Sequence, residues 1–167
     1  MMDEFAPQPT TLRRSRAGDE TAPARPTALP TARDLLSALF GRHAVDHPLV
    51  RWACQLAEIH QAQVGGGRGD PVPRGDLVHE IDMWVELHVP QHRLGPVLHT
   101  ETLGTVIDHI AATQNRIQAE LSGWHGPDGL RLHAAWHRLA ELVDSYDDLV
   151  RDVVRGARRL PAPARGG

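Results

Sequence analysis

The chain has 167 residues, a formal net charge of −3 and a hydrophobic fraction of 41%, which is ordinary for a globular protein. It contains no apolar run near the roughly 18 residues that a membrane span needs. A single cysteine permits no internal disulfide, and the acidic, polar start lacks the basic and apolar regions of a secretory signal. These features argue against a membrane or secreted protein and predict one that works in a reducing cytoplasm.

Charge is distributed unevenly along the chain. Residues 34–154 contain 9 Arg and 17 Asp and Glu, so this part carries a formal charge of −8. Phosphate binding needs concentrated positive charge, which an acidic body does not offer. We therefore expect no nucleic-acid partner.

Both ends of the chain have the composition of disordered segments. Residues 1–30 contain five prolines and almost no large apolar side chains, and the last residues repeat this pattern. Such segments bury too little apolar surface to offset the entropy of ordering. We predict a disordered arm over residues 1–30, a helical domain over residues 31–158 and a flexible tail over residues 159–167.

The first two helices are predicted from their starts. Thr31 and Asp34 have the spacing of a capping box, and the helix that they begin ends near Gly41. Asp46 is the expected N-cap of the second helix, with Pro48 in the first turn, where proline is tolerated. This second helix should run to the glycines that follow residue 64.

A loop rich in glycine and proline over residues 65–74 leads to the third helix. Apolar residues recur at helical spacing from Leu77, and Pro90 ends the helix. Thr100 is the expected N-cap of a fourth helix, which Gly123 closes. The apolar stripe of this fourth helix is Leu103, Val106, Ile107, Ile110, Ile117 and Leu121.

The last helix has the clearest pattern, because its apolar residues alternate steps of four and three. They are Leu132, Trp136, Leu139, Val143, Tyr146, Val150 and Val153. Such a seam is typical of a helix packed against antiparallel partners. Together the elements predict an all-α fold: an antiparallel four-helix bundle with a short leading helix and disordered termini.

Four segments of the chain resemble a known family. They are DHP at residues 46–48 with LAEIH at 56–60, LVHEIDMWV at 77–85, LHTETLGTVIDH at 98–109, and AWHRLAEL at 135–142 with YDDL at 146–149. Together they are similar to the actinobacterial branch of an uncharacterised helical family, domain of unknown function 4254, over about residues 29–161. The resemblance implies a helical bundle in a bacterial cytoplasm and brings no activity with it. Other branches favour Arg where this chain has His109, so a salt bridge made by that arginine does not carry over.

Histidines and carboxylates supply the candidate functional residues. His133 and His137 are four residues apart, so both project from one face of the last helix and could chelate a metal ion. They lack the intervening Glu of the zincin pattern. The favoured alternative is therefore a pair of polar residues on a solvated helix flank.

Glu101 and Asp108 form a second constellation on one face of the fourth helix. If both point inward toward His60 or His88, they could bind a metal ion or act as an acid and a base. In the alternative interpretation, Glu101 complements the helix dipole and Asp108 pairs with an arginine. A lone histidine on an apolar stripe is more often a hydrogen-bonded core residue than a ligand.

Two hypotheses on function follow. In the first, a non-catalytic bundle acts by association, as a homodimer or as an accessory subunit, which requires only the apolar seam and the acidic body. In the second, a small enzyme or ligand-binding bundle holds a divalent metal ion. Its candidate ligands are His60, Glu101, Asp108, His133 and His137. The sequence favours the first hypothesis and leaves open whether the chain is an enzyme.

Overall fold

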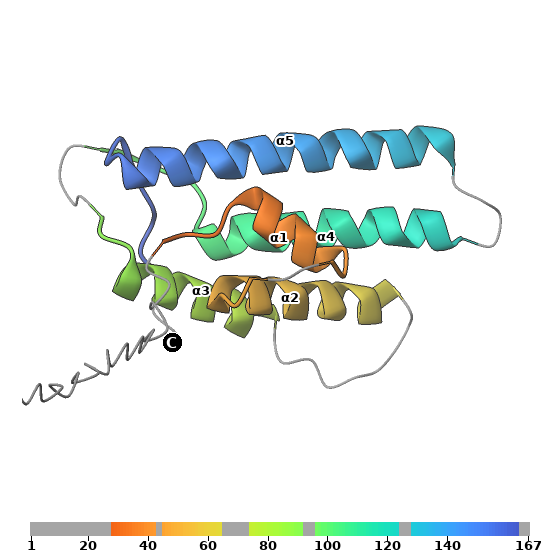
Figure 1. The fold of residues 1–167 in the computed structure, drawn as a ribbon, viewed down its shortest axis with the longest axis horizontal. Coiled ribbons are helices and arrows are strands. Elements are labelled where there is room, and N and C mark those ends of the chain that lie inside the picture. Colours follow the sequence, from red (N-terminus) through yellow and green to blue (C-terminus); the bar gives the residue numbers. More distant parts are fainter. Residues whose placement is uncertain (1–27, 43–44, 65–73, 92–95, 124–127, 164–167) are drawn as a thin grey trace, which may run out of the picture.

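The structure is a computed structural model that describes residues 28–42, 45–64, 74–91, 96–123 and 128–163. Its elements are α1 (Ala32–Leu39), α2 (Pro48–Val64), α3 (Arg74–His88), β1 (Val97–Leu98), α4 (Leu103–Ser122), α5 (Gly129–Val154) and β2 (Arg158–Arg159). Figure 1 shows α5 on one side of α4, α2 and α3 on the other, and the short α1 lying across the front. The predicted all-α bundle with a short leading helix is confirmed.

Helix α4 is the centre of this bundle. It packs against α2, α3 and α5, while α1 contacts both α2 and α5. Because neighbours surround it, α4 buries even polar residues of its second half, such as Gln114 and Asn115. The predicted stripe is buried up to Ile117, whereas Leu121 is 50% exposed and lies outside the core.

Helix α1 begins as predicted. The Thr31 side chain accepts a hydrogen bond from the Asp34 backbone amide, and the Asp34 carboxylate accepts one from the Thr31 amide. The hydroxyl of Tyr146 on α5 donates to the carbonyl of Pro30 at 2.9 Å, and Leu29 packs against the core. Of the predicted arm over residues 1–30, residues 1–27 lie outside the described residues. The last residues of the arm contact the bundle.

Helix α2 begins one residue later than predicted. Its N-cap is His47, whose Nδ1 accepts a hydrogen bond from the Leu49 amide at 3.1 Å, and Pro48 is the first helical residue. Asp46 instead projects into solvent and pairs with Arg51 at 2.5 Å. An imidazole nitrogen has therefore taken the role that a carboxylate more often has.

Helix α4 also begins later than predicted, because its N-cap is Thr102 and not Thr100. The Thr102 side chain accepts a hydrogen bond from the Thr105 amide at 3.2 Å. A second cap comes from α3, because the Asp82 carboxylate accepts a hydrogen bond from the Gly104 amide at 2.8 Å. Burial raises the pKa of Asp82, and the hydrogen bonds that its carboxylate accepts from the Gly104 amide and the Thr102 side chain partly offset that effect.

Helix α5 buries a seam that is rotated from the predicted one. The buried residues are Ala135, Leu139, Leu142, Tyr146, Leu149 and Val153. Three of the predicted positions belong to this set, but Trp136 is 45% exposed and the other predicted residues are only partly buried. Although α5 has 26 residues, none of the helices in the described ranges is long and apolar enough to cross a membrane.

Two short strands close one end of the bundle. Strand β1 pairs in parallel with β2, so that Val97 lies opposite Arg158 and Leu98 opposite Arg159. The next residue, Leu160, is buried, and its amide donates to Oε1 of Gln91 at 2.6 Å. The first residues of the predicted tail over 159–167 therefore contact the bundle, and its last four lie outside the described residues.

Candidate functional site

A buried carboxylate connects three helices in the middle of the bundle. Asp108 on α4 is 1% exposed and accepts a hydrogen bond from Nε2 of His60 on α2 at 2.9 Å. Arg74, the first residue of α3, donates from Nε to the two Asp108 oxygens at 2.9 and 3.0 Å, and its terminal nitrogen contacts Oδ2. We call these three residues the Asp108 cluster.

The Asp108 cluster keeps its carboxylate ionised. Burial by itself would raise the pKa of Asp108, but the hydrogen bonds from His60 and Arg74 and the positive charge of Arg74 lower it to about 2. The same contact raises the pKa of Arg74. At neutral pH the cluster therefore holds a compensated pair of charges.

This arrangement limits the chemistry open to Asp108. The guanidinium of Arg74 occupies both carboxylate oxygens, so a divalent cation at Asp108 would have to displace it. His60 donates from Nε2, and its Nδ1 makes no hydrogen bond with another described residue. The cluster thus ties α2, α3 and α4 together.

The structure leaves Glu101 and His88 apart from this cluster. Glu101 precedes α4 with its side chain 44% exposed, and its carboxylate lies 3.9 Å from Nδ1 of His109. The His88 ring stacks on Trp84 at 4.5 Å and hydrogen-bonds the Trp84 carbonyl at 2.8 Å. Of the predicted inward-pointing set, only His60 and Asp108 meet.

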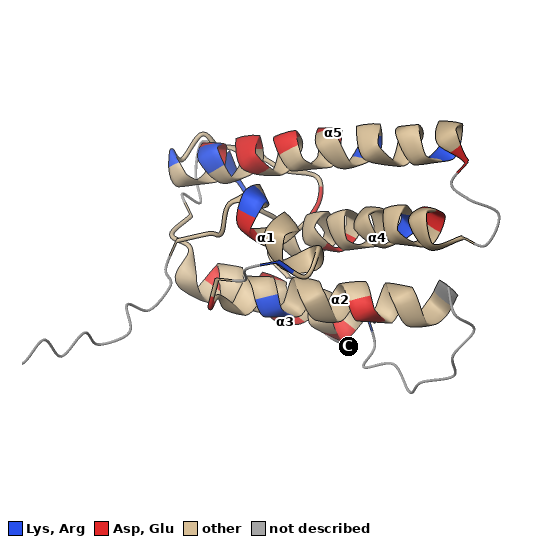
Figure 2. Cartoon of the chain, turned by 45° about the vertical axis from the view of Figure 1, so that its right-hand side comes forward, with Lys and Arg blue, Asp and Glu red and all other residues tan. Residues whose placement is uncertain are grey.

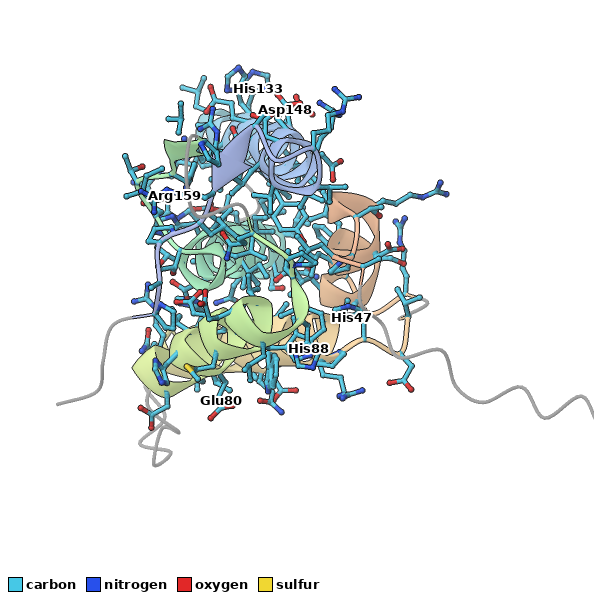
Figure 3. The ribbon with its side chains drawn as sticks, turned by 90° about the vertical axis from the view of Figure 1, so that its left-hand side faces the viewer. His47, Glu80, His88, His133, Asp148 and Arg159 are labelled. Atoms are coloured by element: carbon cyan, nitrogen blue, oxygen red, sulfur yellow. The ribbon has the colours of Figure 1, made fainter. Side chains whose placement is uncertain are left out.

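His133 and His137 lie on the solvent-exposed side of α5. His137 contacts Glu141 at 3.5 Å, with both side chains more than half exposed. Figure 3 places His133 on the outer side of α5, across the bundle from His88 on α3. Among the residues that the structure describes, no three His, Cys, Asp or Glu side chains are grouped to hold one metal ion. A metal site therefore stays a prediction.

The histidine at the start of α2 contacts residues beyond its own helix. His47 is 5% exposed, and its Nε2 lies 3.0 Å from the Ala28 carbonyl, to which it donates because Nδ1 accepts from Leu49. The ring meets Trp84 edge-on at 5.1 Å, and Figure 3 shows His47 and His88 on the same side of the molecule. Burial lowers the pKa of His47. No local sequence pattern signals the contact with residue 28.

An aromatic surface lies over α1 and α5. The rings of Phe40 and Trp136 stack with centroids 5.7 Å apart and planes 10° from parallel. They line a hollow of about 660 Å³. We call the residues that line it the aromatic face: Arg33, Leu36, Ser37, Phe40, Arg42, Trp136, Val143 and Asp147.

Comparison with known proteins identifies the family. Residues 72–162, more than half of the chain, match the family described as protein of unknown function (DUF4254). The chain is a member of the DUF4254 family. No match was found among curated proteins or among solved structures.

The DUF4254 match begins just before α3 and ends after β2. It therefore includes Arg74, Asp108 and Trp136, whereas His60 and Phe40 lie outside it. The match confirms the family resemblance seen in the sequence and adds no activity to it.

Proposed function

We propose that this DUF4254 protein acts by association through its aromatic face, with a second copy of the chain as its partner. The observation that carries the proposal is the stacked Phe40–Trp136 pair, in which a tryptophan at the edge of an apolar hollow is 45% exposed. Tryptophan and arginine are the residues that most often dominate the binding energy of protein interfaces.

The charges around the aromatic face favour a second copy over an unrelated subunit. Arg33 and Arg42 flank the aromatic pair, and both are exposed. Asp147 lines the aromatic face, Asp144 lies on the exposed side of α5, and Figure 2 shows acidic residues along this helix. In a twofold dimer, the arginines of each copy would face the acidic residues of the other.

Sedimentation velocity of the full chain over a range of concentrations tests this proposal. We expect a concentration-dependent dimer that Trp136→Ser weakens by about 30-fold or more, as for a central interface tryptophan. The control is Leu87→Ser, which removes an apolar side chain 72% exposed on α3, away from the aromatic face. The proposal would be contradicted by a chain that stays monomeric at every concentration. A dimer that Leu87→Ser weakens as much as Trp136→Ser does would also contradict it.

The divalent metal site remains a second candidate function because one observation favours it. His60 Nε2 and Asp108 Oδ1, two of the predicted ligands, lie 2.9 Å apart. A metal ion there would have to replace the contacts of Arg74, which counts against this alternative.

Elemental analysis of protein purified without chelator decides the question of the metal. Near-stoichiometric metal that disappears in Asp108→Asn would support a site at the Asp108 cluster. Metal that instead disappears in His133→Ala or Glu101→Ala would place the site among the other predicted ligands. A metal-free protein would remove the candidate.

A further inference from the structure

A polar groove runs between α2 and α4, apart from both the aromatic face and the Asp108 cluster. The end of α1 closes one side of it, and Figure 1 shows that end beside α2 and α4. Its volume is about 500 Å³. The polar residues that line it are Cys54, Glu58 and Gln61 on α2 and Gln114, Asn115, Gln118 and Ser122 on α4.

Asn115 is the residue that points to a ligand. Its side chain is buried, with 8% of the residue exposed, yet its carboxamide makes no hydrogen bond with any described residue. Its polar atoms still reach the surface of the groove, because the described part of the structure contains no fully enclosed polar atom without a partner. Burying an amide is unfavourable unless something supplies its hydrogen bonds, and here water or a ligand that fills the groove supplies them.

The neighbouring amides extend the same surface. Gln114, 4% exposed, donates to the Leu39 carbonyl at 3.0 Å, which holds its carboxamide in place beside Asn115. Gln118 and Gln61 are exposed on the two walls. A carboxamide presents a donor and an acceptor side by side, so these groups match a ligand that does the same.

The charge of the groove narrows the class of ligand further. Glu58 contributes a carboxylate, and the described lining residues include no arginine or lysine. An anion would therefore meet repulsion without a compensating cation. We propose that the groove binds a small neutral ligand with adjacent hydrogen-bond donors and acceptors, either vicinal hydroxyls or carboxamides.

Two neutral probes and one anion test the proposal on the full chain. Xylitol carries vicinal hydroxyls, N-acetylglycinamide carries carboxamides, and succinate serves as the anionic comparison. Two readouts report on the groove: the side-chain amide signals of Asn115 in a nitrogen-15 spectrum, and the alkylation rate of Cys54, the only cysteine of the chain. We expect one of the two neutral probes to shift the Asn115 signals saturably and to slow alkylation. The probe that does so shows whether the ligand carries vicinal hydroxyls or carboxamides.

Variants separate the groove from the rest of the surface. Gln118→Leu changes an exposed residue in the wall of the groove and should weaken binding of the probe by about 3- to 10-fold, the usual loss for one hydrogen bond. Asn115→Leu should abolish the slowing of alkylation. Gln55→Leu, an exposed amide of α2 outside the groove, should leave binding unchanged. The proposal is overturned if neither neutral probe gives a saturable effect, if succinate binds equally well, or if Gln118→Leu behaves as Gln55→Leu does.

Discussion

Asp108 is a buried acid whose charge depends on two neighbours. Without His60 and Arg74, burial would favour its protonated form, whereas with them its pKa falls to about 2. Removing His60 or Arg74 would leave the buried Asp108 charge less compensated and so destabilise the fold, although water already reaches the half-exposed Arg74 side chain. The charge is thus part of the stability of the fold.

Acid unfolding tests this role of Asp108. The pKa in the folded state is about 2 against an ordinary 3.8, so the contribution of the group is complete above pH 3.8 and is lost as the pH falls toward 2. It amounts to about 2 kcal/mol of the free energy of unfolding. Urea unfolding of the wild type and of Asp108→Asn should therefore differ less at low pH than at neutral pH. The exposed Asp144→Asn is the control, and an Asp108 difference independent of pH would refute the assignment.

His47 differs from Asp108, because its contacts require the uncharged form of the side chain. Its neutral ring caps α2 through Nδ1 and holds Ala28 through Nε2, so protonation of Nδ1 would place two donors against each other. Its folded pKa lies below the ordinary 6.5, so its contribution is complete above pH 6.5 and is lost as the pH falls through the folded pKa.

The pH dependence of thermal unfolding checks the role of His47. Asn is a good N-cap that does not titrate, so His47→Asn should remove part of the loss of melting temperature on acidification below pH 6.5. His137→Asn, at an exposed position on α5, supplies the comparison among the other histidines. Identical acid dependence in the wild type and His47→Asn would exclude the proposed effect.

At the level of elements, α3 and α4 approach each other closely at Gly104. A Cβ atom there would lie 2.5 Å from the Val78 carbonyl oxygen and 2.8 Å from Oδ1 of Asp82, and both distances are too short for a side chain. The carboxylate of Asp82 caps α4 at this point. The glycine therefore allows the contact between the helices and the cap together.

A pair of alanine substitutions tests that contact. Gly104→Ala should lower the free energy of unfolding by about 1–3 kcal/mol, because α3 and α4 must separate. Gly75→Ala, in the first turn of α3 with open space around it, should be neutral or stabilising by up to about 1 kcal/mol. Chemical denaturation measures both, and equal effects would show that close packing does not restrict position 104.

The helices themselves were predictable, because the apolar periodicity that marks them is local. Their starts were less so: Asp46 and Thr100 are good caps by residue type, yet His47 and Thr102 take the role through contacts that spacing does not reveal. The seam of α5 is rotated because Leu142 and Leu149 face the interior instead of Val143 and Val150, which neighbouring elements cover only in part.

The candidate site was half predictable for a related reason. His60, on an apolar stripe, and Asp108 were both named as candidates that could point inward, and the structure brings them together. Arg74 was assigned to the loop that ends at residue 74, and no local signal links it to a carboxylate 34 positions away. The exposed aromatic face was missed because Trp136 fits an apolar seam as well as it fits a surface.

At the level of the whole molecule, the bundle is organised around one helix rather than around four equal ones. Helix α4 contacts α2, α3 and α5, and its buried residues include Asp108, Gln114 and Asn115. The Asp108 cluster and the polar groove both lie where this helix meets α2. The aromatic face, by contrast, is formed by α1, by Phe40 and Arg42 just after it, and by α5.

The central position of α4 has a consequence for hydrogen exchange. The backbone amides of its buried first half meet solvent only when the helices around it separate, so they should exchange at rates set by the global free energy of unfolding. The eight-residue α1, which lies across the outside, should open locally and exchange sooner. Mass spectrometry of peptides from the two helices would show this order. A dimer through the aromatic face would slow exchange in α1 with rising protein concentration and leave α4 unchanged.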